Sequence, residues 1–211
     1  MLSNTEFNRE VILKISLALG EMNERVIFVG GATIGFYIND PAAEDVRVTN
    51  DVDITVEIAT LGELESIRQE LIEKGFTQSP EDNVICRFRY DSIKVDVMST
   101  KEMGWAPTNP WFSQGFAQRE TVKLGDQLIR LLPLPYFMAS KFAAYNGRGG
   151  IDPRTSHDFE DIVYVIDNRN DIVDQINKAP NDVRSYLKEQ LGLILEDNAL
   201  QEAVLGNLAY D

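Results

Sequence analysis

Apolar residues at a spacing of four predict a helix over residues 5–23. They lie on one stripe of that helix: Phe7, Val11, Ile15 and Leu19. The apolar run at 26–29 predicts a short strand, which ends at Gly30 and Gly31, and residues 32–38 suit a short helix. Residues 39–50 hold a proline and several charged side chains, which is typical of a loop.

Strict alternation of apolar and polar residues predicts a strand over 51–58. Its apolar face consists of Val52, Ile54, Val56 and Ile58, and its polar face of Asp51, Asp53, Thr55 and Glu57. Two more strand-like stretches, 84–90 and 92–98, follow with Asp91 in the turn between them. The polar face of the second holds Asp96, so two predicted strands each present acidic side chains.

The rest of the pattern divides at Pro133 and Pro135. Before this point we expect a helix, an irregular stretch rich in aromatic residues and a pair of strand-like pieces, at 61–74, 99–118 and 120–132. After it every periodic segment is helical: 136–146, 156–168, 170–177, 181–195 and 198–208. The pattern predicts an α+β (mixed α/β) fold, with a mixed sheet flanked by helices in a core at 1–132 and an all-helical unit at 133–211 packed on it.

Composition and charge narrow the class of protein. The chain has 211 residues and a net charge of −14, distributed as −10 over residues 1–83, +4 over 84–154 and −8 over 155–211. An acidic surface repels nucleic-acid backbones, so extended nucleic-acid binding is disfavoured. No apolar run approaches the ~20 residues of a membrane span, and the single cysteine, Cys86, excludes a disulfide within the chain. We expect a cytoplasmic protein that binds no membrane.

The candidate catalytic residues are three aspartates: Asp51, Asp53 and Asp96. Asp51 and Asp53 are two apart on a strand, so both carboxylates leave the same face. Adjacent carboxylates repel each other unless cations lie between them, and Mg²⁺ prefers carboxylate oxygens. With Asp96 as the third member, the trio predicts a cage for two Mg²⁺ ions, which would activate an attacking oxygen and stabilise a leaving group.

Gly30 and Gly31 end a strand and open a helix. Because glycine has no side chain, the backbone can approach a phosphate closely, and free N–H groups at a helix start can bind it. The spacing matches neither G-x-G-x-x-G nor a P-loop. A triphosphate held at this pair, with metals on the carboxylates, would be arranged for in-line attack at phosphorus.

These motifs resemble those of a known superfamily. The segments VGGATIGF, TNDVDITVE and IKVDVM are similar to the polymerase-β-type nucleotidyltransferases, whose signature is a Gly-Gly or Gly-Ser pair, Asp-x-Asp on a strand and a later Asp on another strand. The resemblance covers residues 26–98. It implies that Asp51, Asp53 and Asp96 are catalytic metal ligands and that Gly30 and Gly31 bind the nucleotide.

A second resemblance covers residues 133–168. The segment LPLPYFMASKFAAYNGRGGIDPRTSHDFEDI is similar to the abortive-infection-type, toxin-like branch of these enzymes, which carries a helix lysine, a nearby arginine and a downstream Asp pair. In this chain those residues would be Lys141, Arg148, Asp158 and Asp161. The resemblance implies that Lys141 and Asp158 bind the nucleotide and that the chain belongs to a toxin–antitoxin context. Toxins of that branch often have a basic face for RNA, and the acidic charge here departs from that pattern.

The expected function is transfer of a nucleoside monophosphate from an NTP, with ATP as the expected nucleotide, to an acceptor hydroxyl. Asp96 would draw the proton from that hydroxyl, and Lys141 would help to neutralise the triphosphate. The acceptor stays open between a small molecule, a protein and an RNA. Two alternatives remain: a catalytically silent nucleotide-binding or antitoxin-like module of the same fold, and a Rossmann-type dehydrogenase domain.

Several candidate residues also have ordinary structural interpretations. The pattern around Lys141 is equally typical of a surface lysine whose apolar stem lies on the protein. Asp161 would be an ordinary acid near a helix start. His157 is interpreted as capping or packing near a helix start, and Cys86 as part of the core. The aromatic residues of 99–118 are expected to pack on one another within their own loop.

Overall fold

The chain forms two units in the computed structural model, which describes residues 3–49, 51–148 and 152–208. The core unit comprises Met1–Gly35 and Asp45–Pro133. The helical unit comprises Phe36–Glu44 and Leu134–Asp211, so it includes a short segment that the sequence assigned to the core.

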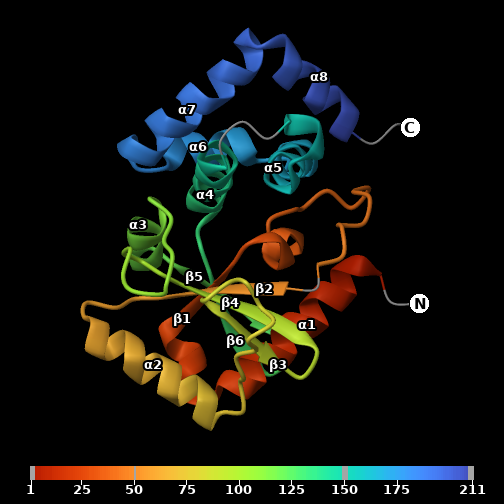
Figure 1. Cartoon of the computed structure of the whole chain (residues 1–211). Helices are drawn as coiled ribbons and strands as arrows, with labels where there is room; N and C mark the ends of the chain where they lie inside the picture. The colour runs from red at the N-terminus through yellow and green to blue at the C-terminus, as the bar shows by residue number, and fades with distance from the viewer. Residues whose placement is uncertain (1–2, 50, 149–151, 209–211) are drawn as a thin grey trace. The chain divides into compact units, whose positions relative to one another are not determined.

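The core unit is built on a six-stranded mixed sheet with the strand order β3-β4-β2-β1-β6-β5. Figure 1 labels these strands. Its strands are β1 (Val26–Val29), β2 (Asp51–Val56), β3 (Arg87–Tyr90), β4 (Ile93–Ser99), β5 (Glu120–Leu124) and β6 (Gln127–Leu131). β2 pairs antiparallel with β1 and parallel with β4, and β1 is parallel to β6. A mixed sheet flanked by helices confirms the predicted fold class.

Alternation along β2 determines which of its side chains enter the core. Val52, Ile54 and Val56 are buried, whereas Asp51 and Asp53 are half-buried. Thr55 is also fully buried, so the polar face of this strand is accessible only at its first half. The two acidic side chains therefore lie where the strand begins and where ions can reach them.

Helices flank the sheet, and their ends follow local sequence signals. They are α1 (Asn4–Leu19), α2 (Leu61–Glu73), α3 (Phe112–Ala117) and the 3₁₀ helices η1 (Gly20–Arg25) and η2 (Gly31–Phe36). Ser3 and Glu6 form a capping box at the start of α1, which satisfies two of its free N–H groups. The predicted helix over 5–23 stops at Leu19 because Gly20 has a φ of 54°, which ends the α-helix.

The helical unit consists of α4 (Leu134–Gly147), η3 (Pro153–Thr155), α5 (His157–Asn168), α6 (Ile172–Lys178), α7 (Asn181–Glu196) and α8 (Asn198–Asn207). All five α-helices were predicted, with ends that differ by a few residues. The segment Phe36–Glu44 is fixed to them by Tyr37, whose ring stacks on Phe137 at 4.1 Å, and by Tyr164, whose hydroxyl donates to the Glu44 carbonyl. Within the described residues, no helix combines the length and apolar character needed to cross a lipid bilayer.

The irregular stretch 99–118 is more ordered than expected, since it contains α3. Trp105, Phe112 and Phe116 are buried. Trp105, however, packs on residues outside this stretch, because its ring centroid lies 5.7 Å from that of Phe88 and the Arg68 guanidinium lies over it. Cys86 is buried beside β3, in agreement with its interpretation as a core residue. Burial, followed by the negative charge of Asp96, raises the pKa of its thiol to about 11.

Candidate active site

Strands β2 and β4 bring Asp53 and Asp96 to paired positions. The parallel register matches Asp53 with Asp96 and Asp51 with Lys94. Neighbouring strands lie about 4.8 Å apart, and paired residues point to the same face, so the two acidic side chains leave the sheet side by side. Asp51 lies two residues earlier on the same face of β2.

Asp96 is held by an arginine that the sequence analysis did not identify. Arg87 lies opposite Asp96 in the antiparallel β3–β4 pair, and its Nε and Nη2 each donate a hydrogen bond of 2.7 Å to the carboxylate. The two side chains are only 18% and 13% exposed. These hydrogen bonds, together with the charges of Asp96 and Asp51, raise the pKa of Arg87 above its usual range.

The three-carboxylate cage expected from the sequence stays a prediction: as they lie in the structure, Asp51, Asp53 and Asp96 do not make up a three-ligand group. Across residues 3–49, 51–148 and 152–208, no three histidine, cysteine or acidic side chains are arranged to hold a metal ion. Both oxygens of Asp96 accept hydrogen bonds from the Arg87 guanidinium. The observed arrangement is an acidic pair on β2 beside an Arg–Asp ion pair.

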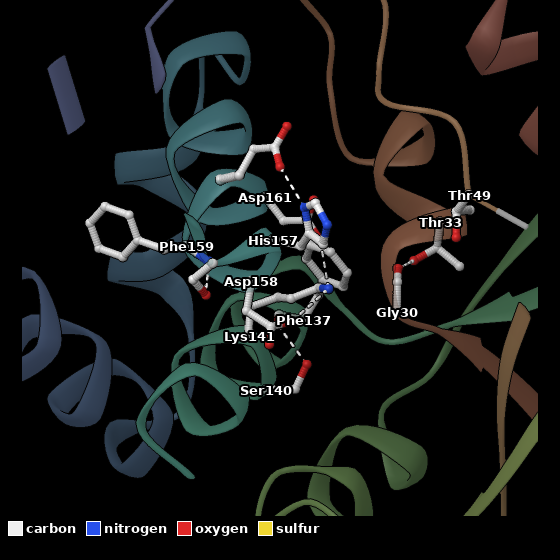
Figure 2. Close-up of polar contacts among 12 residues, drawn as sticks. Gly30, Thr33, Thr49, Phe137, Ser140, Lys141, His157, Asp158, Phe159 and Asp161 are labelled. Atoms are coloured by element: carbon white, nitrogen blue, oxygen red, sulfur yellow. Dashed lines mark hydrogen bonds and ion pairs between the residues drawn. The ribbon is translucent and has the colours of Figure 1, made fainter. Parts of the chain in front are cut away.

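Gly30 has a structural reason to be glycine. Its φ is 75°, a conformation that side chains disfavour, and a Cβ atom there would lie 1.8 Å from Asp53 Oδ2. The carboxylate of Asp53 therefore lies against the Gly30 backbone. Thr33 donates its hydroxyl hydrogen to the Gly30 carbonyl at 2.8 Å, which fixes the turn (Figure 2).

Gly31 leaves room for the side chain of Arg47, a residue that the sequence analysis did not identify. A Cβ atom at Gly31 would lie 2.4 Å from Nη2 of Arg47, so the guanidinium occupies the space of the missing side chain. The same loop carries Thr49, whose hydroxyl donates to the Asp51 carboxylate. The loop that carries Arg47 therefore also supplies a hydrogen bond to Asp51.

The helical unit contains a separate charged cluster around Lys141. Its ammonium lies 3.2 Å from Asp158 Oδ1 and 2.6 Å from Asp161 Oδ2, so α5 supplies two carboxylates to one lysine of α4 (Figure 2). All three residues are buried, and Arg148 Nε lies 3.3 Å from the other Asp158 oxygen. Lys141 is therefore not a surface lysine, and Asp161, interpreted from the sequence as an ordinary acid near a helix start, is a buried partner of this lysine.

His157 is an exposed residue at the start of α5. Its Nδ1 lies 3.0 Å from Glu160 Oε2 one turn along, and the imidazole side chain is 69% exposed. His157 does lie near a helix start, but the cap of α5 is Ser156, whose hydroxyl oxygen accepts from the Phe159 N–H at 3.3 Å.

Similar solved structures identify the fold as that of a nucleotidyltransferase. An antigenic nucleotidyltransferase-like protein from Paracoccidioides brasiliensis has a TM-score of 0.52 and 15% identity, over 99% of this chain and 96% of its own. The antibiotic-resistance factor ANT(2'')-Ia has a TM-score of 0.53 and 14% identity, over 90% of this chain and 96% of its own. At these identities the likeness establishes the fold alone.

The family follows from the sequence match. Residues 11–205 match the family described as nucleotidyl transferase AbiEii toxin, Type IV TA system. The chain therefore belongs to the AbiEii nucleotidyltransferase toxin family. No functionally curated protein matches the sequence.

Proposed function

We propose that this protein is an Mg²⁺-dependent nucleotidyltransferase that moves a nucleoside monophosphate from an NTP to an acceptor hydroxyl. One observation carries the proposal: Asp53 is paired in register with Asp96 and lies against the backbone of Gly30. Acidic side chains from two strands thus lie beside a glycine turn. Metal-assisted transfer from a nucleotide requires both of these elements. Membership of the AbiEii family supports the same reaction class.

Asp51 and Asp53 are the proposed Mg²⁺ ligands, with Asp96 as the third carboxylate. Their donor atoms fit the ion, because carboxylate oxygens are its preferred protein ligands and both β2 side chains are half-buried rather than enclosed. Two bound Mg²⁺ ions would lower the pKa of the attacking hydroxyl and stabilise the leaving pyrophosphate. Because Arg87 already holds Asp96, this third carboxylate would have to share an oxygen with the arginine.

Asp96 is also the proposed acceptor of the hydroxyl proton. In this step the acceptor O–H bond breaks and its proton moves to the Asp96 carboxylate. The acceptor oxygen forms a bond to the α-phosphorus, the bond from this phosphorus to the bridging oxygen breaks, and pyrophosphate leaves. Arg87 orients Asp96 through its two hydrogen bonds, which restricts the carboxylate to one direction.

Gly30, Gly31, Lys141 and Asp158 are the proposed nucleotide-binding residues. Gly30 and Gly31 present backbone without side chains next to Asp53. For Lys141 and Asp158 the proposal rests on the family resemblance. Their buried contact at 3.2 Å keeps the lysine ammonium in one position and gives Asp158 the role of orienting it.

The acceptor is proposed to be a small molecule, a protein or a short accessible part of an RNA. A net charge of −14 disfavours a wide contact with a nucleic-acid backbone. ATP is the proposed donor nucleotide. A catalytically silent nucleotide-binding or antitoxin-like module is the alternative, and it differs in one measurable respect, since it would bind the nucleotide without turnover.

The test is incubation of the protein with each of the four α-³²P-labelled NTPs, Mg²⁺ and a panel of antibiotics, proteins and RNAs. The expected result is a labelled acceptor and released pyrophosphate with one or more NTPs, and loss of both on addition of EDTA. Bound NTP without any labelled acceptor would favour the silent module. If no NTP is bound and none is consumed, the proposal is wrong.

A further inference from the structure

Arg47 lies against the backbone of the Gly-Gly pair. A Cβ atom at Gly31 would be 2.4 Å from Nη2, 3.2 Å from Cζ and 3.7 Å from Nη1 of Arg47. Real Cβ atoms do not approach other atoms so closely, so any larger residue at Gly31 would force the guanidinium to move. The glycine therefore gives room to a cation.

The two glycines make room for opposite charges. At Gly30 the missing side chain leaves space for the carboxylate of Asp53, and at Gly31 it leaves space for the guanidinium of Arg47. An acidic group and a basic group are consequently held over two successive residues of one turn. This pairing suits a ligand that carries cations on one side and exposed anionic oxygens on the other, as a metal-bound polyphosphate does.

The backbone of Arg47 is fixed by a buried side chain of α1, although its own segment has no regular structure. Asn8 is 2% exposed; its Nδ2 donates to the Arg47 carbonyl at 3.0 Å, and its Oδ1 accepts from the Thr49 N–H at 3.2 Å. Both ends of the amide are thus satisfied by the same loop. Breaking this clamp would leave buried polar groups unpaired, so the loop is held in place.

The charge distribution explains why a cation is needed here. Residues 1–83 carry a net charge of −10, and the acidic side chains of β2 lie in this segment. A triphosphate has about four negative charges, and Mg²⁺ ions shared with carboxylates leave part of that charge uncompensated. An arginine supplies a planar fork of donors that matches phosphate oxygens in a bidentate manner.

We propose that Arg47 binds the polyphosphate of the NTP through its guanidinium above Gly31. The inference rests on the proposed function, because it assigns a further residue to the same nucleotide site. It also places one cationic contact in the acidic N-terminal segment, whereas the sequence analysis assigned neutralisation of the triphosphate to Lys141.

The first test measures equilibrium binding of a non-hydrolysable NTP analogue and of the matching NMP, each with Mg²⁺. Arg47→Ala should weaken binding of the NTP analogue about 10- to 100-fold, the loss expected for a charged hydrogen bond, and leave NMP binding within about twofold. Arg47→Gln, which keeps the length and polarity of the side chain, provides a second variant in case the alanine variant is unstable. Arg25→Ala is the matched control, because it removes the same charge from the core unit just before β1, at the opposite end of that strand.

The second test is a double-mutant cycle with Gly31→Ala. In the wild-type background this substitution should weaken NTP binding, because the new methyl group displaces the guanidinium. In the Arg47→Ala background the further loss of affinity should be clearly smaller than in the wild-type background, since the guanidinium that the methyl group displaces is absent and only the approach of the phosphate to the Gly31 backbone is affected. Fully independent effects of the two substitutions would contradict the contact.

The outcomes separate this inference from the proposed function. If wild type and Arg47→Ala bind the NTP analogue equally and both transfer label from an NTP, Arg47 has no role in binding while the proposed function stands. If wild type binds no NTP with Mg²⁺, both the inference and the proposed function are overturned. Equal weakening of NTP and NMP would also overturn the inference, because it would indicate a general disturbance of the site.

Discussion

Arg87 donates two hydrogen bonds of 2.7 Å to the carboxylate of Asp96, from the residue that faces it across the β3–β4 pair. The geometry is bidentate, so it fixes the direction of the carboxylate as well as its position. Asp96 in turn is paired in register with Asp53. The orientation of one proposed catalytic carboxylate therefore depends on an arginine outside the sequence motif.

Replacing Arg87 should slow transfer without weakening nucleotide binding. We expect Arg87→Ala to lower kcat about 10- to 100-fold, as loss of groups that orient metal or catalytic ligands usually does, and Arg87→Lys to give an intermediate value because it keeps the charge but loses the fork. Arg89→Ala is the matched control, since Arg89 forms an equivalent bidentate pair with Asp82 two residues along β3. Steady-state kinetics and NTP binding measure the two quantities. An equal effect of both variants, or a change in NTP affinity alone, would argue against a positioning role for Arg87.

Gly30→Ala should abolish transfer by displacing Asp53. The new Cβ would lie 1.8 Å from Asp53 Oδ2, and the φ of 75° adds backbone strain of about 1–2 kcal/mol. Gly75→Ala introduces similar strain at a φ of 89°, but its Cβ would have only an ordinary contact of 3.9 Å with the Tyr90 ring. Urea unfolding should therefore give comparable losses of stability, while only Gly30→Ala loses transfer. Retained transfer in Gly30→Ala would mean that the position of Asp53 is not important.

Removing Lys141 should destabilise the helical unit. Lys141→Ala leaves Asp158 and Asp161 buried without their shared cation, and breaking a buried ion pair on one side costs about 3–5 kcal/mol. A second substitution, Asp161→Asn, should restore part of this stability because it removes one of the unpaired charges.

Lys178→Ala on the exposed surface of α6 is the control and should change the free energy of unfolding by less than about 0.5 kcal/mol. A Lys141→Ala variant as stable as wild type would contradict this account of the cluster.

Cys86 should react with alkylating agents only at high pH. Burial, followed by the Asp96 charge, raises the pKa of its thiol from 9.0 to about 11, and only the thiolate reacts. Because the folded state binds this proton more tightly than the unfolded state, the contribution to stability is complete below pH 9 and is lost as the pH rises towards 11. The iodoacetamide reaction rate, measured against pH, should have its midpoint near 11 in the native protein and near 9 in urea. A native midpoint near 9 would contradict the burial of the thiol.

The acidic strands were predictable because alternation with a period of two is a local signal. It located β2 and β4 and assigned Asp51, Asp53 and Asp96 to polar faces. The Arg87–Asp96 pair could also have been predicted from the sequence. A two-residue turn at Asp91 and Ser92 fixes the register of the hairpin and places these two residues opposite each other. Arg47 carried no such signal, because its contact with Gly31 depends on how an irregular loop is fixed by Asn8.

The burial of Lys141 had a signal that the sequence analysis did not use. Residues 134–142 of α4 are all buried, and a helix that is mostly apolar around its circumference is an interior helix. A lysine in such a helix needs buried acidic partners, and the Asp pair of α5 supplies them. The identity of these partners depends on how two helices pack, which the periodicity of either helix does not specify.

We propose that the carboxylates of β2 bind the Mg²⁺ ions needed for transfer, and label transfer from α-³²P-NTP by Asp53→Asn beside wild type tests this role. The substitution removes a metal-binding charge from a half-buried side chain and keeps its shape against Gly30. We predict that wild type labels an acceptor and that Asp53→Asn loses this activity by several orders of magnitude, with an unchanged melting temperature. Transfer by a folded Asp53→Asn at a rate close to that of wild type would show that the β2 carboxylates do not carry the reaction.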